Sequence, residues 1–349
     1  MTSAGNKPTS DFRSDTVTRP SPAMRQAMAT AEVGDDVLDG DPTVRALETF
    51  AARWLGKDGA LYVPSGTMAN QIALGCWLRP GDEVIAAEDA HVLLFEGGAT
   101  GFLHGAQSAT MPTDRGAFDE AALRARVRPD FIHCPPTALI CVEQTHMGSG
   151  GSVVTQDALA MVRRVADEHS LPVHMDGARL ANAQVASGMP AAEIAACADS
   201  VSVCLSKGLG APVGSIVAGN ADFIERAKRV RKRLGGWMRQ AGVIAACGLY
   251  AFEHNIERLS EDHALARSLA ERLGAIRGLV TDPAHVETNL ILVGVEHPAH
   301  DPASLSAALA AHDVLVMPLS PTHLRFVTHM DVGPQDLDRL VEACTTLLT

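Results

Sequence analysis

One lysine follows a short run of β-branched and apolar residues that predicts a buried strand at 201–204. Lys207 comes two residues after Leu205 and is followed by glycines at 208 and 210, which leave room for a group to lie against the backbone. An ammonium group at a buried strand end is costly unless it is paired or used covalently, and a desolvated lysine can form a Schiff base. Taken alone, a lysine that pairs or reaches solvent is the commoner case. The neighbouring motifs decide between a Schiff-base lysine and one that only pairs or reaches solvent.

Two other predicted strands lead into residues that could hold an aromatic phosphate. A strand at 60–63 is followed by Ser65, Gly66 and Thr67, a turn into a helix whose N–H groups and hydroxyl could bind a phosphate. An ordinary helix cap explains that turn about as well. A strand at 84–87 is followed by His91, whose imidazole could stack on a ring or serve only a structural purpose.

A carboxylate and a guanidinium complete this set of strand ends. Asp176 follows a strand predicted at 173–175, and Arg179 comes three residues later. Pyridoxal phosphate needs a lysine for its aldehyde, N–H donors for its phosphate and a carboxylate that keeps its pyridine nitrogen protonated. An arginine nearby could hold a substrate carboxylate through two hydrogen bonds. Together the strand ends favour a pyridoxal-phosphate site.

The elements that position these residues predict an α/β fold. From residue 59 short strands alternate with helices, which is typical of a mostly parallel sheet covered on both faces, with ligand sites beyond the carboxyl ends of its strands. Seven strands are predicted, at 60–63, 84–87, 106–110, 138–142, 173–175, 201–204 and 216–218. We expect a disordered segment at 1–10, a large domain at 11–254 that starts with a polar arm, and a smaller α+β domain at 255–349.

Composition narrows the class of protein. The chain has 349 residues, 46% of them hydrophobic, and a formal net charge of -12, which argues against non-specific binding to nucleic acid. Its seven cysteines are scattered without zinc spacing and predict small buried side chains in a reducing compartment. No apolar run approaches the length of a membrane span. These features predict a cytoplasmic protein without a metal ion, a membrane or a nucleic-acid partner.

Nine short stretches occur together in one order along the chain. They are RSDTVT at 13–18, GDDV at 34–37, DPT at 41–43, PSGTM at 64–68, HMDGAR at 174–179, CLSKGL at 204–209, APVGS at 211–215, MRQAG at 238–242 and RFVTH at 325–329. In these stretches the sequence resembles the low-specificity L-threonine aldolases, a family of fold-type-I pyridoxal-phosphate enzymes. The resemblance extends from Asp11 to the C-terminus.

The resemblance implies a role for each matching position. Lys207 would form the Schiff base with the cofactor, Asp176 would hold its ring nitrogen, and His91 would stack on its ring. The phosphate would be bound by Ser65, Gly66 and Thr67, with Lys232 and Arg239 reaching in from a neighbouring subunit. The substrate carboxylate would be held by Ser14, Arg179 and Arg325, and His133 matches a second active-site histidine. The active site would then be shared between subunits of a homotetramer, a dimer of dimers.

The implied reaction is retro-aldol cleavage of L-β-hydroxy-α-amino acids, such as L-threonine and L-allo-threonine, to glycine and an aldehyde. His91, His133 or a water that they position could be the base that takes the β-hydroxyl proton. Leu38 stands where the family often has a tyrosine, which extends the expected substrates to L-phenylserine. A β-eliminating lyase or an amino-acid racemase is the nearest alternative, since the same lysine and aspartate would serve it. A cofactor-free binding protein is a more distant one.

Overall fold

The computed structural model describes residues 9–129 and 131–349 of the chain. A seven-stranded sheet forms the larger part of the fold, and its order is β2 (Gly59–Val63), β8 (Ser215–Gly219), β7 (Ser200–Cys204), β6 (Val173–Asp176), β5 (Thr137–Glu143), β3 (Glu83–Ala87) and β4 (Gln107–Met111). Strands β7, β6, β5, β3 and β4 run parallel, and β8 is antiparallel to both of its neighbours. The predicted α/β fold and all seven predicted strands are therefore confirmed, with ends that differ by at most one residue.

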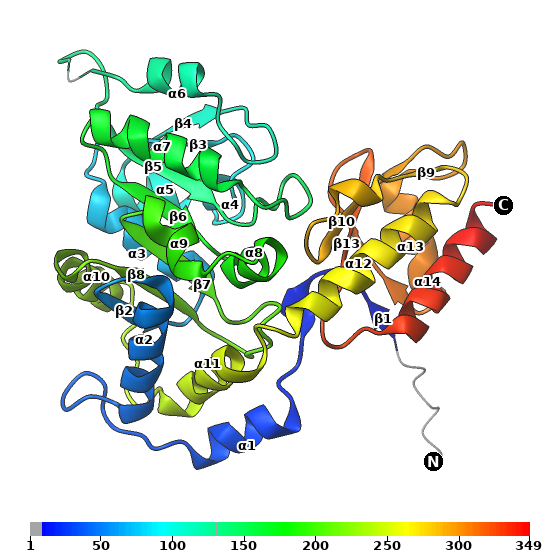
Figure 1. Ribbon diagram of the computed structural model, residues 1–349, viewed down its shortest axis with the longest axis horizontal. Coiled ribbons are helices and arrows are strands. Elements are labelled where there is room, and N and C mark those ends of the chain that lie inside the picture. Colours follow the sequence, from blue (N-terminus) through cyan, green and yellow to red (C-terminus); the bar gives the residue numbers. More distant parts are fainter. Residues whose placement is uncertain (1–8, 130) are drawn as a thin grey trace.

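Both faces of this sheet are buried, which explains its nearly continuous apolar strands. Along β2, Leu61 and Val63 pack with α3 (Gly66–Trp77) and α10 (Ala221–Arg233), whereas Ala60 and Tyr62 face the opposite cluster. The helices that contribute to that opposite cluster are α1 (Pro22–Thr30), α2 (Pro42–Leu55), α6 (Glu120–Arg126), α7 (Gln156–Glu168), α8 (Leu180–Ser187), α9 (Ala191–Ile194), α11 (Gly242–His254) and the first residue of α12 (Leu259–Gly274). In Figure 1 the strands of the sheet separate α3 and α10 from α7 and α9.

The C-terminal part of the chain has its own sheet and hydrophobic cluster. Strands β12 (Met317–Pro318), β13 (His323–Val327), β10 (Leu290–Val295) and β9 (Leu279–Val280) are antiparallel in that order. They pack with α12, α13 (Pro302–Ala310) and α14 (Pro334–Leu347), which lie on the right in Figure 1. These elements match the expected small α+β unit, while its exact boundary at residue 254 stays a prediction.

The N-terminal arm joins the two parts. Strand β1 (Ser10–Asp11) pairs in parallel with β11 (Val314–Leu315), and Phe12 is buried in the C-terminal cluster. A 3-10 turn, η1 (Asp15–Val17), then leads toward the large sheet, where Thr18 Oγ1 donates to the backbone oxygen of Lys207 (3.2 Å). The arm was expected from its polarity, and it lies between the two sheets as Figure 1 shows.

Two predictions fall on or near the N-terminus. Residues 1–8, most of the segment expected to be disordered, lie outside the described residues. Ser10, which was assigned to the same segment, is fully buried and belongs to β1, because pairing with β11 satisfies its backbone.

The remaining short elements are α4 (His91–Leu94), α5 (Ala99–His104), η2 (Ala195–Cys197) and η3 (Pro283–His285). In the described part of the chain, none of the helices is both long and apolar enough to cross a bilayer.

Candidate active site

The structure brings Lys207, Asp176 and His91 to one edge of the large sheet. Asp176 is the last residue of β6, Lys207 follows β7, and His91 opens α4 after β3. These three strands run parallel, so their carboxyl ends meet at the same edge. Asp176 is buried and Lys207 is half-buried. The local chain direction thus explains why residues far apart in sequence face one another.

Asp176 is held as a buried carboxylate. Its Oδ2 accepts a hydrogen bond from Asn70 Nδ2 (2.8 Å), and its Oδ1 accepts one from the backbone N–H of Ala178 (3.1 Å). Burial by itself favours the neutral acid, but the charges of His91 and Lys207 and the Asn70 hydrogen bond outweigh it and lower the pKa of Asp176. A carboxylate that stays ionised is what a protonated pyridine nitrogen requires.

His91 is oriented by a second buried carboxylate. Its Nδ1 lies 3.0 Å from Glu96 Oε1, and the Glu96 side chain has no exposed surface. Burial disfavours the imidazolium, yet the Glu96 hydrogen bond and the charge of Asp176 raise the pKa of His91. The side-chain oxygens of Glu96 and Asp176 and a ring nitrogen of His91 lie within 4.8 Å of one another. Sequence reasoning missed Glu96 because no spacing rule marks an acid in the turn after α4.

The start of α3 forms the expected anion cradle. Ser65 is its N-cap and uses its Oγ to accept the N–H of Met68 (3.2 Å), so the Ser65 side chain serves the helix itself. The N–H groups of Gly66 and Thr67, in the first turn, have no partner within a helix and face a partly exposed surface. Beside them, the buried Oγ of Ser215 has no hydrogen-bond partner among the described residues. It lies 3.6 Å from where a Cβ on Gly66 would stand. These groups fit a phosphate.

Arg179 forms an ion pair with Asp15, a residue that the sequence analysis did not single out. Its Nε donates to Asp15 Oδ2 (2.8 Å) and its Nη2 to Asp15 Oδ1 (2.7 Å), and both side chains are buried. The expected role of Arg179 in holding the substrate carboxylate stays a prediction. Two of its N–H groups already bind Asp15, and only the others remain available.

The Arg179 guanidinium holds the pKa of Asp15 far below its usual range, although burial alone would raise that pKa. Asn289 Nδ2 also donates to Asp15 Oδ2 (3.2 Å), which ties this ion pair to the segment before β10. Asp15 lies in the RSDTVT stretch, and its place next to Ser14 was the one available signal. The arm therefore contributes a buried carboxylate, while the expected role of the Ser14 hydroxyl stays a prediction.

Arg325 and Ser14 lie on the other side of the same site. Strand β13 carries Arg325, which is 7% exposed, and its Nη2 donates to the backbone oxygen of Arg13 (3.0 Å), the residue before Ser14. The buried Nε of Arg325 has no partner among the described residues. Burial and the charge of Arg179 lower the pKa of Arg325. A buried guanidinium with an unpaired donor fits a carboxylate ligand.

Three predicted site residues do not join this cluster in the single chain. His133 is exposed and lies before β5 begins at Thr137, at the amino end of the strand and so at the opposite edge from Asp176. Lys232 is exposed in the last turn of α10, and Arg239 is exposed and forms an ion pair with Asp35 (3.0 Å). The last two were expected to serve a neighbouring subunit, and that expectation stays a prediction.

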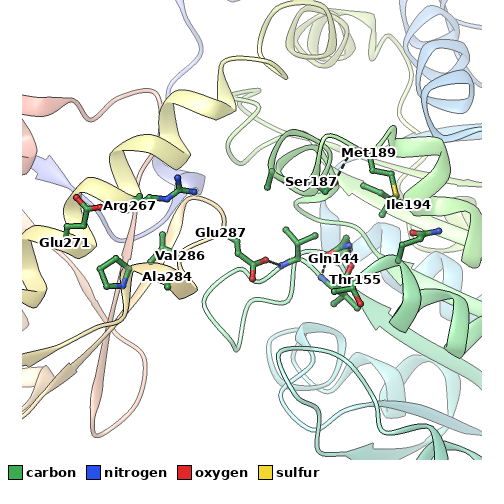
Figure 2. Close-up of a pocket in the computed structure, with 15 residues that line it drawn as sticks. Gln144, Thr155, Ser187, Met189, Ile194, Arg267, Glu271, Ala284, Val286 and Glu287 are labelled. Carbon is green, nitrogen blue, oxygen red and sulfur yellow. Dashed lines mark hydrogen bonds between the residues drawn. The ribbon is translucent and has the colours of Figure 1, made fainter.

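A large cavity lies beside this cluster instead of within it. It has a volume of about 740 Å³ and is walled on one side by α12 and the segment 283–287, on the other by residues that follow β5 and by α8 (Figure 2). Glu287 reaches across and accepts the N–H of Val153 (2.7 Å). The lining groups with a charge are Arg267, Glu271 and Glu287, which do not form a nucleophile or base constellation. The chemistry therefore belongs to the cluster around Lys207 and Asp176.

Comparisons with known proteins agree with this geometry. The profile of the family described as beta-eliminating lyase matches residues 11–296. A low-specificity L-threonine aldolase of Arabidopsis thaliana is 43% identical over 94% of this chain and 93% of its own length. A low specificity L-threonine aldolase of Escherichia coli strain K12 is 43% identical over 94% of this chain and 96% of its own.

A solved structure of a Leishmania major threonine aldolase superposes with a TM-score of 0.81 at 21% identity, covering 97% of this chain and 99% of that one. That identity is low enough for the likeness to show the shared fold alone. The two 43% identical relatives cover nearly the whole chain, including every strand end described above. The chain belongs to the low-specificity L-threonine aldolase family, within the wider group of beta-eliminating lyases.

Proposed function

We propose that this protein uses pyridoxal phosphate to cleave L-β-hydroxy-α-amino acids into glycine and an aldehyde. The proposal rests on one observation above all: a half-buried lysine and a buried, ionised aspartate meet at one sheet edge, beside a helix start with free N–H groups. Family membership supports the same cofactor and reaction. The substrates would be L-threonine, L-allo-threonine and L-phenylserine.

The residues around the cluster fit this cofactor. Lys207 would hold its aldehyde, Asp176 its ring nitrogen, and His91 would lie against its ring. The start of α3 would bind its phosphate through the N–H groups of Gly66 and Thr67. When bound there, pyridoxal phosphate draws electrons away from the α-carbon of an amino acid attached to it.

The protein's own side chains would bind and orient the substrate. Arg325, with its free Nε, and the remaining N–H groups of Arg179 would hold the substrate carboxylate, with Ser14 at the edge of that site. Fixing the carboxylate fixes which bond at the α-carbon is aligned for cleavage. His91, or a water that it positions, would take the β-hydroxyl proton, since in the single chain His133 lies at the opposite sheet edge.

An assay of product identity tests the proposal. Purified protein with pyridoxal phosphate would be incubated separately with L-threonine, L-allo-threonine and L-phenylserine, and glycine and aldehyde would be quantified. Equimolar glycine and aldehyde support the aldolase. A keto acid with ammonia would identify a β-eliminating lyase, and appearance of the D-enantiomer would identify a racemase. Either result would replace the proposed reaction while leaving the cofactor in place.

We also propose that the active enzyme is a homotetramer in which Lys232 and Arg239 complete the phosphate site of a neighbouring subunit. The exposure of both side chains in the single chain supports this arrangement. Light scattering after size-exclusion chromatography would give the mass. Mixing inactive Lys207→Ala and Arg239→Ala subunits would restore part of the activity if sites are shared, and would restore none if each chain is self-sufficient.

The cellular location is proposed as the cytoplasm. All seven cysteines are free, which suits a reducing compartment. Fractionation of the source cells, followed by immunoblotting of each fraction, would test this location directly.

A further inference from the structure

Asn70, in the second turn of α3, stands at the centre of a buried hydrogen-bond network beneath the candidate active site. It is 2% exposed, and its Nδ2 donates to two different carboxylates, Asp176 Oδ2 (2.8 Å) and Glu96 Oε1 (2.7 Å). The same Glu96 oxygen lies 3.0 Å from His91 Nδ1. One amide group thus connects the carboxylate of Asp176 with the carboxylate that orients His91.

Ser202 and His174 fix the orientation of the Asn70 amide through its oxygen. Asn70 Oδ1 accepts from Ser202 Oγ (2.7 Å) and lies 3.1 Å from His174 Nε2. The ionised carboxylate of Asp176 can only accept hydrogen bonds, so the NH₂ group of Asn70 must face Asp176, and the same group reaches Glu96. Its oxygen must then face Ser202 and His174. All four hydrogen-bonding positions of the amide are used, which leaves it one orientation.

The chain of hydrogen bonds continues to the other end of α3. His174 Nδ1 lies 3.0 Å from Ser200 Oγ, which accepts the indole N–H of Trp77 (2.9 Å). Burial lowers the pKa of His174 to about 4, so its ring is neutral and can donate from Nε2 to Asn70. Trp77 is the last residue of α3, so both ends of the network are anchored to the same helix.

Two carboxylates held this close in a buried site repel each other, and repulsion of this kind usually protonates one of them. Asn70 places a donor on each, and His91 lies against both, which offsets the repulsion. Without the amide, Asp176 and Glu96 would lose a hydrogen bond each and would be free to change their separation. The position of each acid therefore depends on the other through Asn70.

We propose that Asn70 is a positioning residue that sets two active-site groups at once: Asp176, and His91 by way of Glu96. The inference rests on the proposed function, because it assigns Asp176 and His91 to the cofactor. Gln71, the next residue of α3, provides a matched contrast. It donates to Glu96 Oε2 (2.7 Å) and lies 3.1 Å from His104, and it makes no contact with Asp176.

The test compares Asn70→Leu with Gln71→Met in the holoenzyme. One readout is retention of pyridoxal phosphate, measured as its dissociation constant, together with the pH midpoint of the visible band of the bound cofactor. The other is the proton NMR signal of the His91 Nδ1–H, assigned by its loss in His91→Asn. A hydrogen bond to a charged group corresponds to a change of about tenfold or more in the dissociation constant.

We expect Asn70→Leu to weaken cofactor binding about tenfold or more, to shift the pH midpoint and to move the His91 signal. Gln71→Met should move the His91 signal and leave the dissociation constant and the midpoint unchanged. The ionisable groups that act on Asp176 stay the same in both variants; they are His91, His174, Lys207, Glu96, Glu143 and Cys141. A difference between the variants therefore reports on Asn70.

Equal cofactor affinity and equal midpoints in the two variants would overturn the proposal. If Asn70→Leu does not fold, Asn70→Ala decides the question, because it removes the same amide group and leaves a smaller side chain. A loss of cofactor affinity supports the proposal, and an unchanged affinity and midpoint overturn it. Wild-type protein that binds no pyridoxal phosphate would instead refute the proposed function, so the two failures are distinguishable.

Discussion

Replacing Asp15 by asparagine tests the least expected feature of the site. The substitution keeps the shape of the side chain and removes the charge that Arg179 faces. Arg179 donates to both oxygens of Asp15 at 2.7 and 2.8 Å, and Asn289 adds a third hydrogen bond. The variant leaves a buried guanidinium opposite an amide, which can accept at one position only.

The expected loss of unfolding free energy in Asp15→Asn follows from the burial of Asp15 and Arg179. The Asp15 side chain is 0% exposed and that of Arg179 is 4% exposed, so solvent cannot compensate for the lost charge. Breaking a buried pair by removing one partner costs about 3 to 5 kcal/mol of unfolding free energy, and the retained amide places Asp15→Asn near the lower end. The cost is present at neutral pH because the pKa of Asp15 lies well below its usual range, so the pair is fully charged there.

Asp11 offers a matched control in the same arm. It also faces an arginine with two hydrogen bonds, to Arg13 at 2.8 and 2.6 Å, but the side chains are 21% and 46% exposed. Exposed pairs of this kind contribute about 0 to 1 kcal/mol. Urea unfolding at pH 7.5, followed by circular dichroism, would compare Asp15→Asn, Asp11→Asn and wild type.

A further variant separates the lost pair from a general disturbance of the arm. Adding Arg179→Met to Asp15→Asn removes the uncompensated charge and should recover part of the stability. If Asp15→Asn and Asp11→Asn unfold at the same urea concentration as wild type, the buried pair does not stabilise the fold and the reasoning fails.

Three other expectations follow from the same site. Lys207→Ala should lose the visible band of bound cofactor and nearly all turnover; substantial glycine release by this variant would refute its role. Arg325→Ala should reduce kcat/KM, through a loss of about 2 to 5 kcal/mol of interaction with the substrate carboxylate, while Arg13→Ala at the exposed pair should not. Unfolding free energy should fall between pH 6.5 and about 4, by up to about 1.4 kcal/mol per pH unit for His174, since burial lowers its pKa to about 4 and the unfolded chain takes up the proton first. His174→Gln should flatten that slope, and an unchanged slope would show that His174 is not the group involved.

Most of the fold could be predicted from local sequence patterns. Each strand of the large sheet is a short apolar run between turns, such as 173–175 before Asp176, and burial on both faces makes that signal strong. The end of α2 at Gly56 follows from a glycine in a left-handed conformation, which other residues adopt at a cost.

Only part of the candidate site could be predicted from the sequence. Lys207, Asp176 and His91 were found because each lies at or shortly after the carboxyl end of a strand, and parallel strands end at one edge. Asp15 was missed because its partner Arg179 is distant in sequence, and a polar arm gives no sign of which of its residues will be buried. Glu96 and Asn70 were missed for the same reason, since each is defined by a contact with another element.

The sequence by itself determined which residue types end which strands, and through them the α/β sheet and the position of Lys207 and Asp176 at one of its edges. These properties depend on neighbours along the chain, where propensity and hydrophobic periodicity operate. Only the tertiary structure decided that Arg179 is bound to Asp15 and that one amide holds Asp176 and Glu96 together. Those contacts join the arm, α3 and the strand ends, and their strength comes from burial, which no single segment has before the elements pack.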